Sequence, residues 1–337
     1  MATGELIEVR NPRSGEIDYR FQAPSDVELA TTLDRLRSAQ RIWAARPLAE
    51  RIEILRRWRS EWVARQAEIA RALSIDTGRY LIATSEVQSV TGMIDRWTNL
   101  VPTLAAEKEL RSATLPTISY RSQYVPYGLV GIISPWNFPV SLCFIDAVPA
   151  LLAGCAVFVK PSEVTPRFVA PAMQSIAAVP ELAAVFHIQP GGRPTGEQLV
   201  ERSDVVCFTG SVATGRQVAA NAARHFIPAF LELGGNDPLI ITASADLERA
   251  TDVALRATSL ATGQACQSLE RVYVDRRIFD VFVKRLVEKA SAIAPNWPDI
   301  HSGTIGPFIF GKQADTVAAQ LADAVAKGAK VLCGGQI

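Results

Sequence analysis

The chain has 337 residues, of which 48% are hydrophobic and 20% are charged, a composition typical of a globular protein and not of a disordered one. Lysine and arginine (35) nearly balance aspartate and glutamate (34), so the net charge of +1 gives no support to a large nucleic-acid-binding surface. The length suggests about two domains, because a domain typically has roughly 100–200 residues.

The first residues, MATGELIEVRNPRSGEI, lack the basic stretch and the apolar core of a secretory signal. The longest apolar run, at 147–159, is interrupted by Pro149 and Gly154 and is too short to span a bilayer. The five cysteines form no CxxC pair and no cluster with the three histidines. These features predict a cytoplasmic protein with no membrane partner, no nucleic-acid partner, no disulfide framework and no metal site.

Apolar residues recur at helical spacing along the segment 26–73, with arginines and glutamates between them. Because acidic residues alternate with the arginines, we interpret the charged positions as a solvated helix face and not as a nucleic-acid-binding surface. The residues predicted to pack inward are Ile52, Leu55, Trp62, Ile69 and Leu73.

The pattern changes after Pro116, where residues 118–125 alternate between apolar and polar. Helix-forming stretches then separate four short runs that are nearly continuous in apolar residues, at 129–134, 156–160, 185–188 and 205–209. Buried parallel strands have this composition, so the pattern predicts a parallel α/β sheet of the Rossmann type.

A second series of strand and helix signals begins near Pro238. It predicts a helix at 278–293 and strands at 238–242, 271–275 and 330–334.

Cys266 lies in GQACQS, among glycine and polar residues and not in an apolar stripe. A cysteine is a strong nucleophile only as a thiolate, which requires a cation, a helix N-terminus or a base nearby. A structural cysteine is the alternative reading of this residue. The other four cysteines lie in apolar runs and are assigned to the core, namely Cys143, Cys155, Cys207 and Cys333.

Two polar residues next to predicted strands are further candidates. Glu232, in FLELGGNDP, is expected to be partly buried, which would raise its pKa and suit it to general-base catalysis, although a structural salt bridge explains it equally well. Asn137, in SPWNFP, is either a turn residue or an amide that donates to an oxyanion.

Two segments at strand ends suit a nucleotide. FTGSVATG, from Phe208 to Gly215, follows a strand and opens a helix, so its free backbone N–H groups suit a pyrophosphate. KPSE, from Lys160 to Glu163, puts a cation and a carboxylate at the carboxyl end of another strand, where α/β sheets bind ligands.

In this order, the segments SPWNFP, KPSE, GRPTG, FTGSVATG, LELGGNDP and GQACQS resemble the aldehyde dehydrogenase superfamily. The similarity extends from EVRNPRSGE to KGAKVLCGG, over nearly the whole chain. It implies NAD(P)-dependent oxidation of an aldehyde to a carboxylic acid through a cysteine thiohemiacetal and a thioester. In this resemblance Cys266 is the catalytic thiol, Glu232 the general base and Asn137 the oxyanion-binding amide.

The resemblance also implies a cofactor site, with NAD preferred over NADP. Lys160 and Glu163 would hold the adenosine ribose. The Glu163 carboxylate would accept hydrogen bonds from both ribose hydroxyls and would repel a 2′-phosphate. The other residues expected at the cofactor are Ile133, Ser134, Pro135, Trp136, Ser162, Gly192, Thr209, Gly210, Ser211, Gly215, Leu233 and Gly234.

Six uncharged residues would line the aldehyde entrance, which favours a neutral apolar or aromatic aldehyde, since a carboxylate-bearing one would require an arginine. They are Phe138, Leu142, Ile145, Leu260, Ala265 and Gln267.

By the same resemblance, residues 1–107 and 127–234 form the NAD-binding domain, 108–126 an oligomerisation arm and 235–337 part of the catalytic domain. The family continues beyond this point with a glutamate–phenylalanine motif, so we expect a C-terminally incomplete member that is inactive alone. A full-length form is expected to be a homodimer or homotetramer.

Three alternatives stay open at this level. A non-catalytic cofactor-binding module of the same fold is motivated by the expected missing segment. A cysteine hydrolase without nicotinamide is disfavoured because His187, His225 and His301 are isolated in the sequence. A CoA-acylating or phosphorylating relative is disfavoured by the presence of Glu232, which suits hydrolysis.

Overall fold

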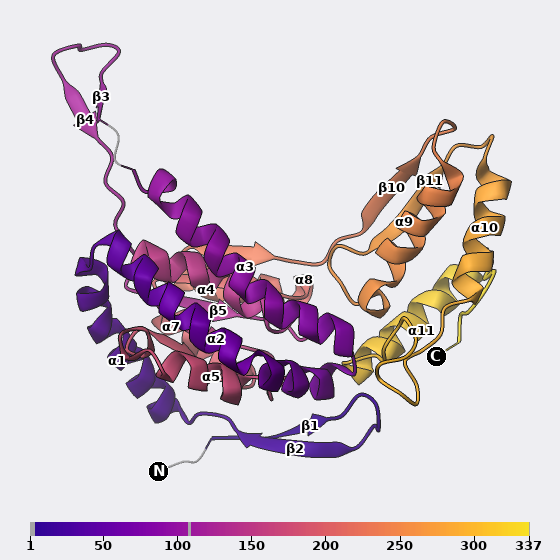
Figure 1. The fold of residues 1–337 in the computed structure, drawn as a ribbon, viewed down its shortest axis with the longest axis horizontal. Coiled ribbons are helices and arrows are strands. Elements are labelled where there is room, and N and C mark those ends of the chain that lie inside the picture. Colours follow the sequence, from indigo (N-terminus) through magenta and orange to yellow (C-terminus); the bar gives the residue numbers. More distant parts are fainter. Residues whose placement is uncertain (1–3, 107–108, 337) are drawn as a thin grey trace.

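The computed structural model describes residues 4–106 and 109–336 (Figure 1). Residues 1–3, 107, 108 and 337, which the expected domain and arm boundaries include, lie outside the described residues. In the described ranges, no helix combines the length and the apolar character that a membrane span requires.

A β-hairpin and three long helices form the N-terminal part of the fold. The helix α1 begins at a capping box in which the side chains of Ser25 and Glu28 each accept a hydrogen bond from the other residue's backbone N–H. Arg46 takes an extended backbone before Pro47, so the predicted helical segment is divided between two helices. The elements are β1 (Leu6–Arg10), β2 (Ile17–Gln22), α1 (Asp26–Ala45), α2 (Leu48–Thr77) and α3 (Tyr80–Leu104).

The centre of the molecule is a five-stranded parallel sheet in the order β7-β6-β5-β8-β9. In its register, Val130 lies opposite Val157 on one side and Val205 on the other. The four predicted central runs are confirmed as strands, with a fifth strand after them. The strands are β5 (Leu129–Ile133), β6 (Ala156–Lys160), β7 (Phe186–Ile188), β8 (Val205–Thr209) and β9 (Ala229–Glu232).

Helices cover both faces of this sheet. The helices α4 and α5 pack between the sheet and α2, whereas α1, α7 and α8 contact β5, β6, β8 and β9 and one another. The connections run in one direction from β5 to β7 and then return to β8, so the strand order reverses between β5 and β8. A crevice forms at the carboxyl ends of the strands at such a reversal. The helices are α4 (Ser141–Ala153), α5 (Val169–Ala177), α6 (Pro180–Ala183), α7 (Arg193–Arg202) and α8 (Val212–Arg224).

An aromatic cluster anchors α2 to α4 and β7. The ring centroids of Trp62 and Phe144 are 4.9 Å apart, and Trp58 lies 5.8 Å from Phe186 in an edge-on arrangement. The indole N–H of Trp58 donates to Ser175 Oγ at 3.0 Å, which satisfies its buried polar atom. All five residues predicted to pack inward from the segment 26–73 are buried, as predicted.

A second, smaller unit lies at the opposite end from α1 (Figure 1). Its core contains Ile241, Ala254 and Phe282, and its two strands are parallel. The predicted strands at 238–242 and 271–275 and the helix at 278–293 are confirmed. The elements are β10 (Asp237–Ile241), α9 (Leu247–Ser259), β11 (Leu269–Val274), α10 (Phe279–Ser291) and α11 (Gly311–Ala326).

The expected strand at 330–334 is not formed. No strand in the described part of the chain pairs with this segment, and an extended segment without a partner has no hydrogen-bond ladder to stabilise it. The side chains of Val331 and Leu332 are consequently 50% and 58% exposed. The assignment of Cys333 to the core is wrong for the same reason, since Cys333 is exposed whereas Cys143 and Cys155 are buried and Cys207 packs half-buried against the core.

A narrow hairpin projects from the body of the molecule (Figure 1). It pairs β3 (Glu109–Arg111) with β4 (Ser119–Arg121) as a separate two-stranded sheet. Only three residues of the alternating segment 118–125 adopt strand geometry. Of the expected arm 108–126, Lys108 lies outside the described residues, and the role of the arm in joining subunits stays a prediction.

Candidate active site

A cleft of about 1530 Å³ opens at the carboxyl ends of the central strands, where the strand order reverses, and reaches the loop that carries Cys266. Except for Gly215, all residues expected at the cofactor line it. They are Ile133, Ser134, Pro135, Trp136, Lys160, Ser162, Glu163, Gly192, Thr209, Gly210, Ser211, Leu233 and Gly234. Gly215 is buried in α8, where an added Cβ would lie 2.5 Å from the Leu233 side chain. Because glycine has no Cβ, the Leu233 side chain can lie against α8 and line the cleft.

The N-terminus of α8 faces this cleft. Ser211 is its N-cap, and the Ser211 hydroxyl accepts a hydrogen bond from the N–H of Thr214 at 3.2 Å. The N–H groups of Val212 and Ala213, in the first turn, have no intrahelical acceptor. Unpaired N–H groups and the helix dipole together favour an anion, so this end of the cleft fits a pyrophosphate.

The ion pair of Lys160 and Glu163 lies at the end of β6. The Lys160 ammonium is buried and donates to the carbonyl of Gly191 at 2.6 Å. It lies 3.3 Å from Glu163 Oε2, while the Glu163 side chain is 44% exposed and lines the cleft. Burial lowers the pKa of Lys160, and the Glu163 charge acts in the opposite direction. The open carboxylate is an acceptor suited to a ribose diol.

The side chain of Asn137 makes a long-range hydrogen bond. Its side-chain Nδ2 donates to the backbone carbonyl of Gln264 at 3.0 Å, across 127 positions of sequence. The second hydrogen of this amide has no partner among the described residues. Its backbone carbonyl accepts a hydrogen bond from Arg79 Nη2 at 2.5 Å. The turn after β5 is therefore joined directly to the loop that carries Cys266.

A strained turn leads into the Cys266 loop. Ala261 and Thr262 adopt φ values of 56° and 61°, which non-glycine residues rarely take, and Gly263 follows at 69°. Such positions cost roughly 1–3 kcal/mol each and persist only where other contacts hold them. The buried Gln264 side chain supplies such contacts, since its amide donates hydrogen bonds to the carbonyls of Ala261 and Pro307, both at 3.1 Å.

Cys266 itself is exposed and lines the cleft. Its backbone N–H forms no hydrogen bond with any described residue. This N–H and the free amide hydrogen of Asn137 belong to the two segments that the Asn137–Gln264 hydrogen bond joins. Two unpaired donors, the Asn137 amide hydrogen and the Cys266 N–H, therefore belong to residues that line the same cleft as the thiol.

The expectation that Glu232 is partly buried is wrong. Glu232 ends β9, which is an edge strand of the sheet in the described residues, and its side chain is exposed because no further strand covers it. The segment after it does reach the Cys266 loop, since an added Cβ on Gly235 would lie 3.1 Å from the Cys266 carbonyl oxygen. Burial and, to a smaller extent, the Glu232 charge raise the pKa of Asp146 on α4, so Glu232 also lies within electrostatic range of that carboxyl.

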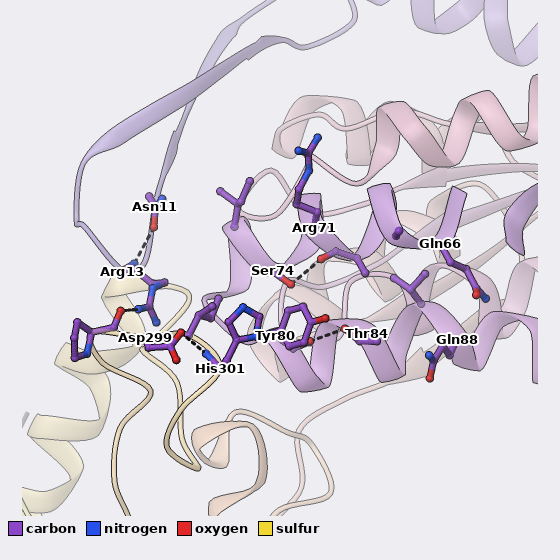
Figure 2. Close-up of a pocket in the computed structure, with 16 residues that line it drawn as sticks. Asn11, Arg13, Gln66, Arg71, Ser74, Tyr80, Thr84, Gln88, Asp299 and His301 are labelled. Atoms are coloured by element: carbon purple, nitrogen blue, oxygen red, sulfur yellow. Dashed lines mark hydrogen bonds between the residues drawn. The ribbon is translucent and has the colours of Figure 1, made fainter. Parts of the chain in front are cut away.

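The histidines lie away from Cys266. His301 belongs to a separate pocket of about 830 Å³, where its ring lies 4.2 Å from that of Tyr80 (Figure 2). His225 caps the C-terminal end of α8, and burial on β7 lowers the pKa of His187 to about 4. All three are described and none lines the cleft, so no Cys–His pair is available for a hydrolase of that type.

Of the residues expected around the aldehyde, only Ala265 lines the cleft. Phe138 packs against the Arg79 guanidinium at 5.4 Å from its ring centroid, and Leu142 lies in the first turn of α4. The exposed fractions of Ile145 and Leu260 are 46% and 47%, and Gln267 is exposed.

Several residues at this site carry no recognisable signal in the sequence. Arg79 and Glu86 of α3 are buried beneath the Asn137 turn, and nothing in their local sequence pointed to the site. The α11 side of the cleft, including Phe310, is likewise not predictable from the motifs. The ring of Phe310 lies 5.9 Å from that of Trp136. Gln264 stood beside the predicted nucleophile in the sequence, but its role depends on two distant carbonyls.

A doubly wound parallel sheet with a cleft at its strand-order reversal, and with a cysteine lining that cleft, is typical of the dinucleotide-binding class of proteins. The family model described as "Aldehyde dehydrogenase family" matches residues 1–337. The chain belongs to the aldehyde dehydrogenase family.

Known relatives agree with this assignment. A protein of Mycolicibacterium smegmatis, named as a candidate succinate-semialdehyde dehydrogenase [NADP(+)], is 34% identical over 313 residues, which are 92% of this chain and 60% of that protein. A solved structure of a candidate aldehyde dehydrogenase, PutA, from Anabaena variabilis is 46% identical with a TM-score of 0.95, covering 99% of this chain and 71% of that one. Lactaldehyde dehydrogenase from Escherichia coli is 29% identical with a TM-score of 0.93, covering 98% and 70%. The chain thus spans about 60% of the length of the curated relative.

Proposed function

We propose that the protein oxidises an aldehyde to a carboxylic acid with NAD(P), through a thioester on Cys266. The observation that carries this proposal is the exposed Cys266 in the cleft at the carboxyl ends of the strands, on a loop joined to Asn137 by the 3.0 Å hydrogen bond to Gln264. A nucleophile next to preorganised donors is the arrangement that acyl chemistry requires.

Each residue has a distinct part in the proposed mechanism. The Cys266 thiolate adds to the aldehyde carbon and forms a thiohemiacetal, whose oxyanion accepts hydrogen bonds from the Asn137 amide and the Cys266 N–H. Bound NAD(P) supplies the hydride acceptor that turns this adduct into a thioester. Glu232 takes a proton from water, which attacks the thioester and releases the acid and the thiol.

NAD is the proposed cofactor, in preference to NADP. The half-exposed carboxylate of Glu163 offers acceptors for both ribose hydroxyls, whereas a 2′-phosphate at the same position would meet like charge. The neighbouring ammonium of Lys160 is occupied by the Gly191 carbonyl and by Glu163, so it offsets only part of this repulsion. The relative from M. smegmatis is named for NADP(+), which makes the comparison of the two cofactors informative.

A neutral apolar or aromatic aldehyde is the proposed substrate. The residues expected at its entrance carry no charge, and an anionic aldehyde would require a cationic partner. The name of the M. smegmatis relative refers to the anionic succinate semialdehyde, so this substrate is the direct comparison. We expect a higher kcat/KM for benzaldehyde than for succinate semialdehyde in the intact protein, and the reverse order would exclude the neutral assignment.

The mechanism is tested by replacing the thiol in the intact protein. We expect Cys266→Ala to abolish NAD reduction with any aldehyde and to abolish ester hydrolysis, because both require the same acyl acceptor. Cys333→Ala is the matched control, since that cysteine is also exposed but does not line the cleft. Turnover that persists in Cys266→Ala would contradict the mechanism.

A further inference from the structure

A buried arginine and a buried glutamate of α3 hold both ends of the turn that carries Asn137. Arg79, the N-cap of α3, is 3% exposed and donates from Nη2 to the Asn137 carbonyl at 2.5 Å. Glu86, two turns further along α3 and 4% exposed, accepts through Oε2 a hydrogen bond from the N–H of Ser141 at 3.1 Å. The segment from Asn137 to Ser141 is thus tied at both ends to one helix.

Arg79 reaches the nucleophile loop as well. Its Nη1 lies 3.5 Å from the carbonyl oxygen of Ala261, the first residue of the left-handed turn before Cys266. The same carbonyl accepts a hydrogen bond from Gln264 Nε2 at 3.1 Å. One guanidinium therefore contacts the two backbone segments that must keep a fixed distance for the Asn137 amide and the thiol to act together.

The two charges compensate each other in a site closed to water. Burial lowers the pKa of Arg79 to about 10, and the negative charge of Glu86 acts in the opposite direction. Burial raises the pKa of Glu86 to about 7, while the hydrogen bond from Ser141 and the charge of Arg79 act against it. Two buried opposite charges contribute little net stability, because desolvation offsets their attraction. The hydrogen bonds from Arg79 to the Asn137 carbonyl and from the Ser141 N–H to Glu86 therefore explain better why both charges are buried here.

We infer that Arg79 and Glu86 form a buried clamp that positions the Asn137 side chain against the Cys266 loop. The inference rests on the proposed function, because it concerns the oxyanion donor of that mechanism. Neither residue touches the reacting atoms, so both are positioning residues. Displacing a preorganised group by about 1 Å is enough to cost on the order of 10²-fold in rate.

The test is a double-mutant cycle in the intact protein. We expect Arg79→Met to lower kcat about 10–100-fold while the KM for NAD is unchanged, and Arg79→Lys to restore part of the loss. In an Asn137→Ala background the same Arg79→Met change should cost almost nothing, because the group that it positions is already gone. Alkylation of Cys266 by iodoacetamide, which needs no oxyanion donor, should proceed at the wild-type rate in Arg79→Met.

Two further variants keep the test decisive. Arg79→Met/Glu86→Gln removes both charges and thereby avoids an unpaired buried carboxylate, so it keeps the test possible if Arg79→Met alone does not fold. Arg59→Met removes a half-exposed ion pair with Asp95 between α2 and α3 and should leave kcat unchanged. Equal losses from Arg79→Met in the wild-type and Asn137→Ala backgrounds would overturn the clamp. An Asn137→Ala variant with full activity would instead contradict the proposed function itself.

Discussion

The side chain of Asn137 donates a hydrogen bond to the backbone carbonyl of Gln264 at 3.0 Å, and this contact joins the two units of the molecule at the candidate active site. Asn137 follows the central strand β5, whereas Gln264 lies in the loop between α9 and β11. The bond uses one of the two amide hydrogens, so the other is available to a developing oxyanion next to Cys266.

This geometry predicts the consequence of removing the amide. Asn137→Ala should lower kcat about 10²–10³-fold, the usual effect of losing one preorganised oxyanion donor, with little change in the affinity for NAD. Steady-state kinetics and cofactor titration of the intact protein measure both quantities. Asn236→Ala is a suitable control, because Asn236 also lines the cleft but its side chain has no assigned role. A variant that binds NAD normally and turns over at full rate would return Asn137 to a turn residue.

Cofactor preference depends on the carboxylate of Glu163. We expect a higher kcat/KM for NAD than for NADP in the intact protein, and we expect Glu163→Ser to reduce that ratio by removing both the hydroxyl acceptors and the repulsion of a 2′-phosphate. Glu201→Ser, at another acidic position in the cleft, should leave the ratio unchanged. A ratio that does not respond to Glu163→Ser would exclude this residue from ribose recognition.

The projecting hairpin predicts an oligomer interface. Leu110 lies opposite Tyr120 in its register, and their exposed fractions are 46% and 53%. Exposed apolar side chains on a narrow hairpin favour contact with another protein surface. Leu110→Glu/Tyr120→Glu should reduce the mass of the intact protein in solution, measured by light scattering, whereas Ser119→Glu on the same strand should not. An unchanged mass in the double variant would argue against the hairpin as an interface.

A buried ion pair between α2 and the segment before α5 predicts a stability effect. Asp76 is fully buried, its Oδ1 lies 3.1 Å from Arg167 Nη1, and its Oδ2 accepts the Arg167 backbone N–H at 2.8 Å. Arg167→Met leaves this carboxylate without its ion-pair partner and should lower the free energy of unfolding by about 3 kcal/mol. Asp76→Asn/Arg167→Met should recover most of the loss in urea unfolding.

The exposed pair of Arg193 and Glu197 provides the comparison for this prediction, since its side chains are 72% and 52% exposed. Arg193→Met should change the free energy of unfolding by less than about 1 kcal/mol. Equal effects of Arg167→Met and Arg193→Met would show that burial does not decide the contribution of the Asp76 pair.

The pH dependence of stability follows from Glu86. Its pKa is raised by burial from 4.5 to about 7, so the folded protein binds this proton more tightly than the unfolded chain does. The contribution of Glu86 to the free energy of unfolding is therefore largest below about pH 4.5 and is lost as the pH rises through about 7. Glu86→Gln keeps an acceptor for the Ser141 N–H but cannot titrate. The Tm of the wild type relative to Glu86→Gln should fall between pH 5 and pH 8, and a constant difference would contradict the assignment.

Local sequence determined four of the five central strands and the order of the motifs. Buried parallel strands must be apolar on both faces, so runs such as Ala156–Lys160 are recognisable without any knowledge of their neighbours. Residues at the ends of those strands or shortly after them, such as Lys160 and Asn137, are predictable site residues because carboxyl ends of parallel strands meet at one edge of the sheet.

Only the tertiary structure decided which groups are buried and which backbone carbonyls they meet. Arg79 has an ordinary sequence context at a helix start, yet it lies beneath a turn 58 positions away. Glu232 was expected to be partly buried but is exposed, because burial depends on what covers an edge strand and not on the strand's own residues. The segment 330–334 has strand composition but no partner strand in the described residues. Periodicity is encoded locally, whereas desolvation and backbone pairing depend on segments far away in the chain.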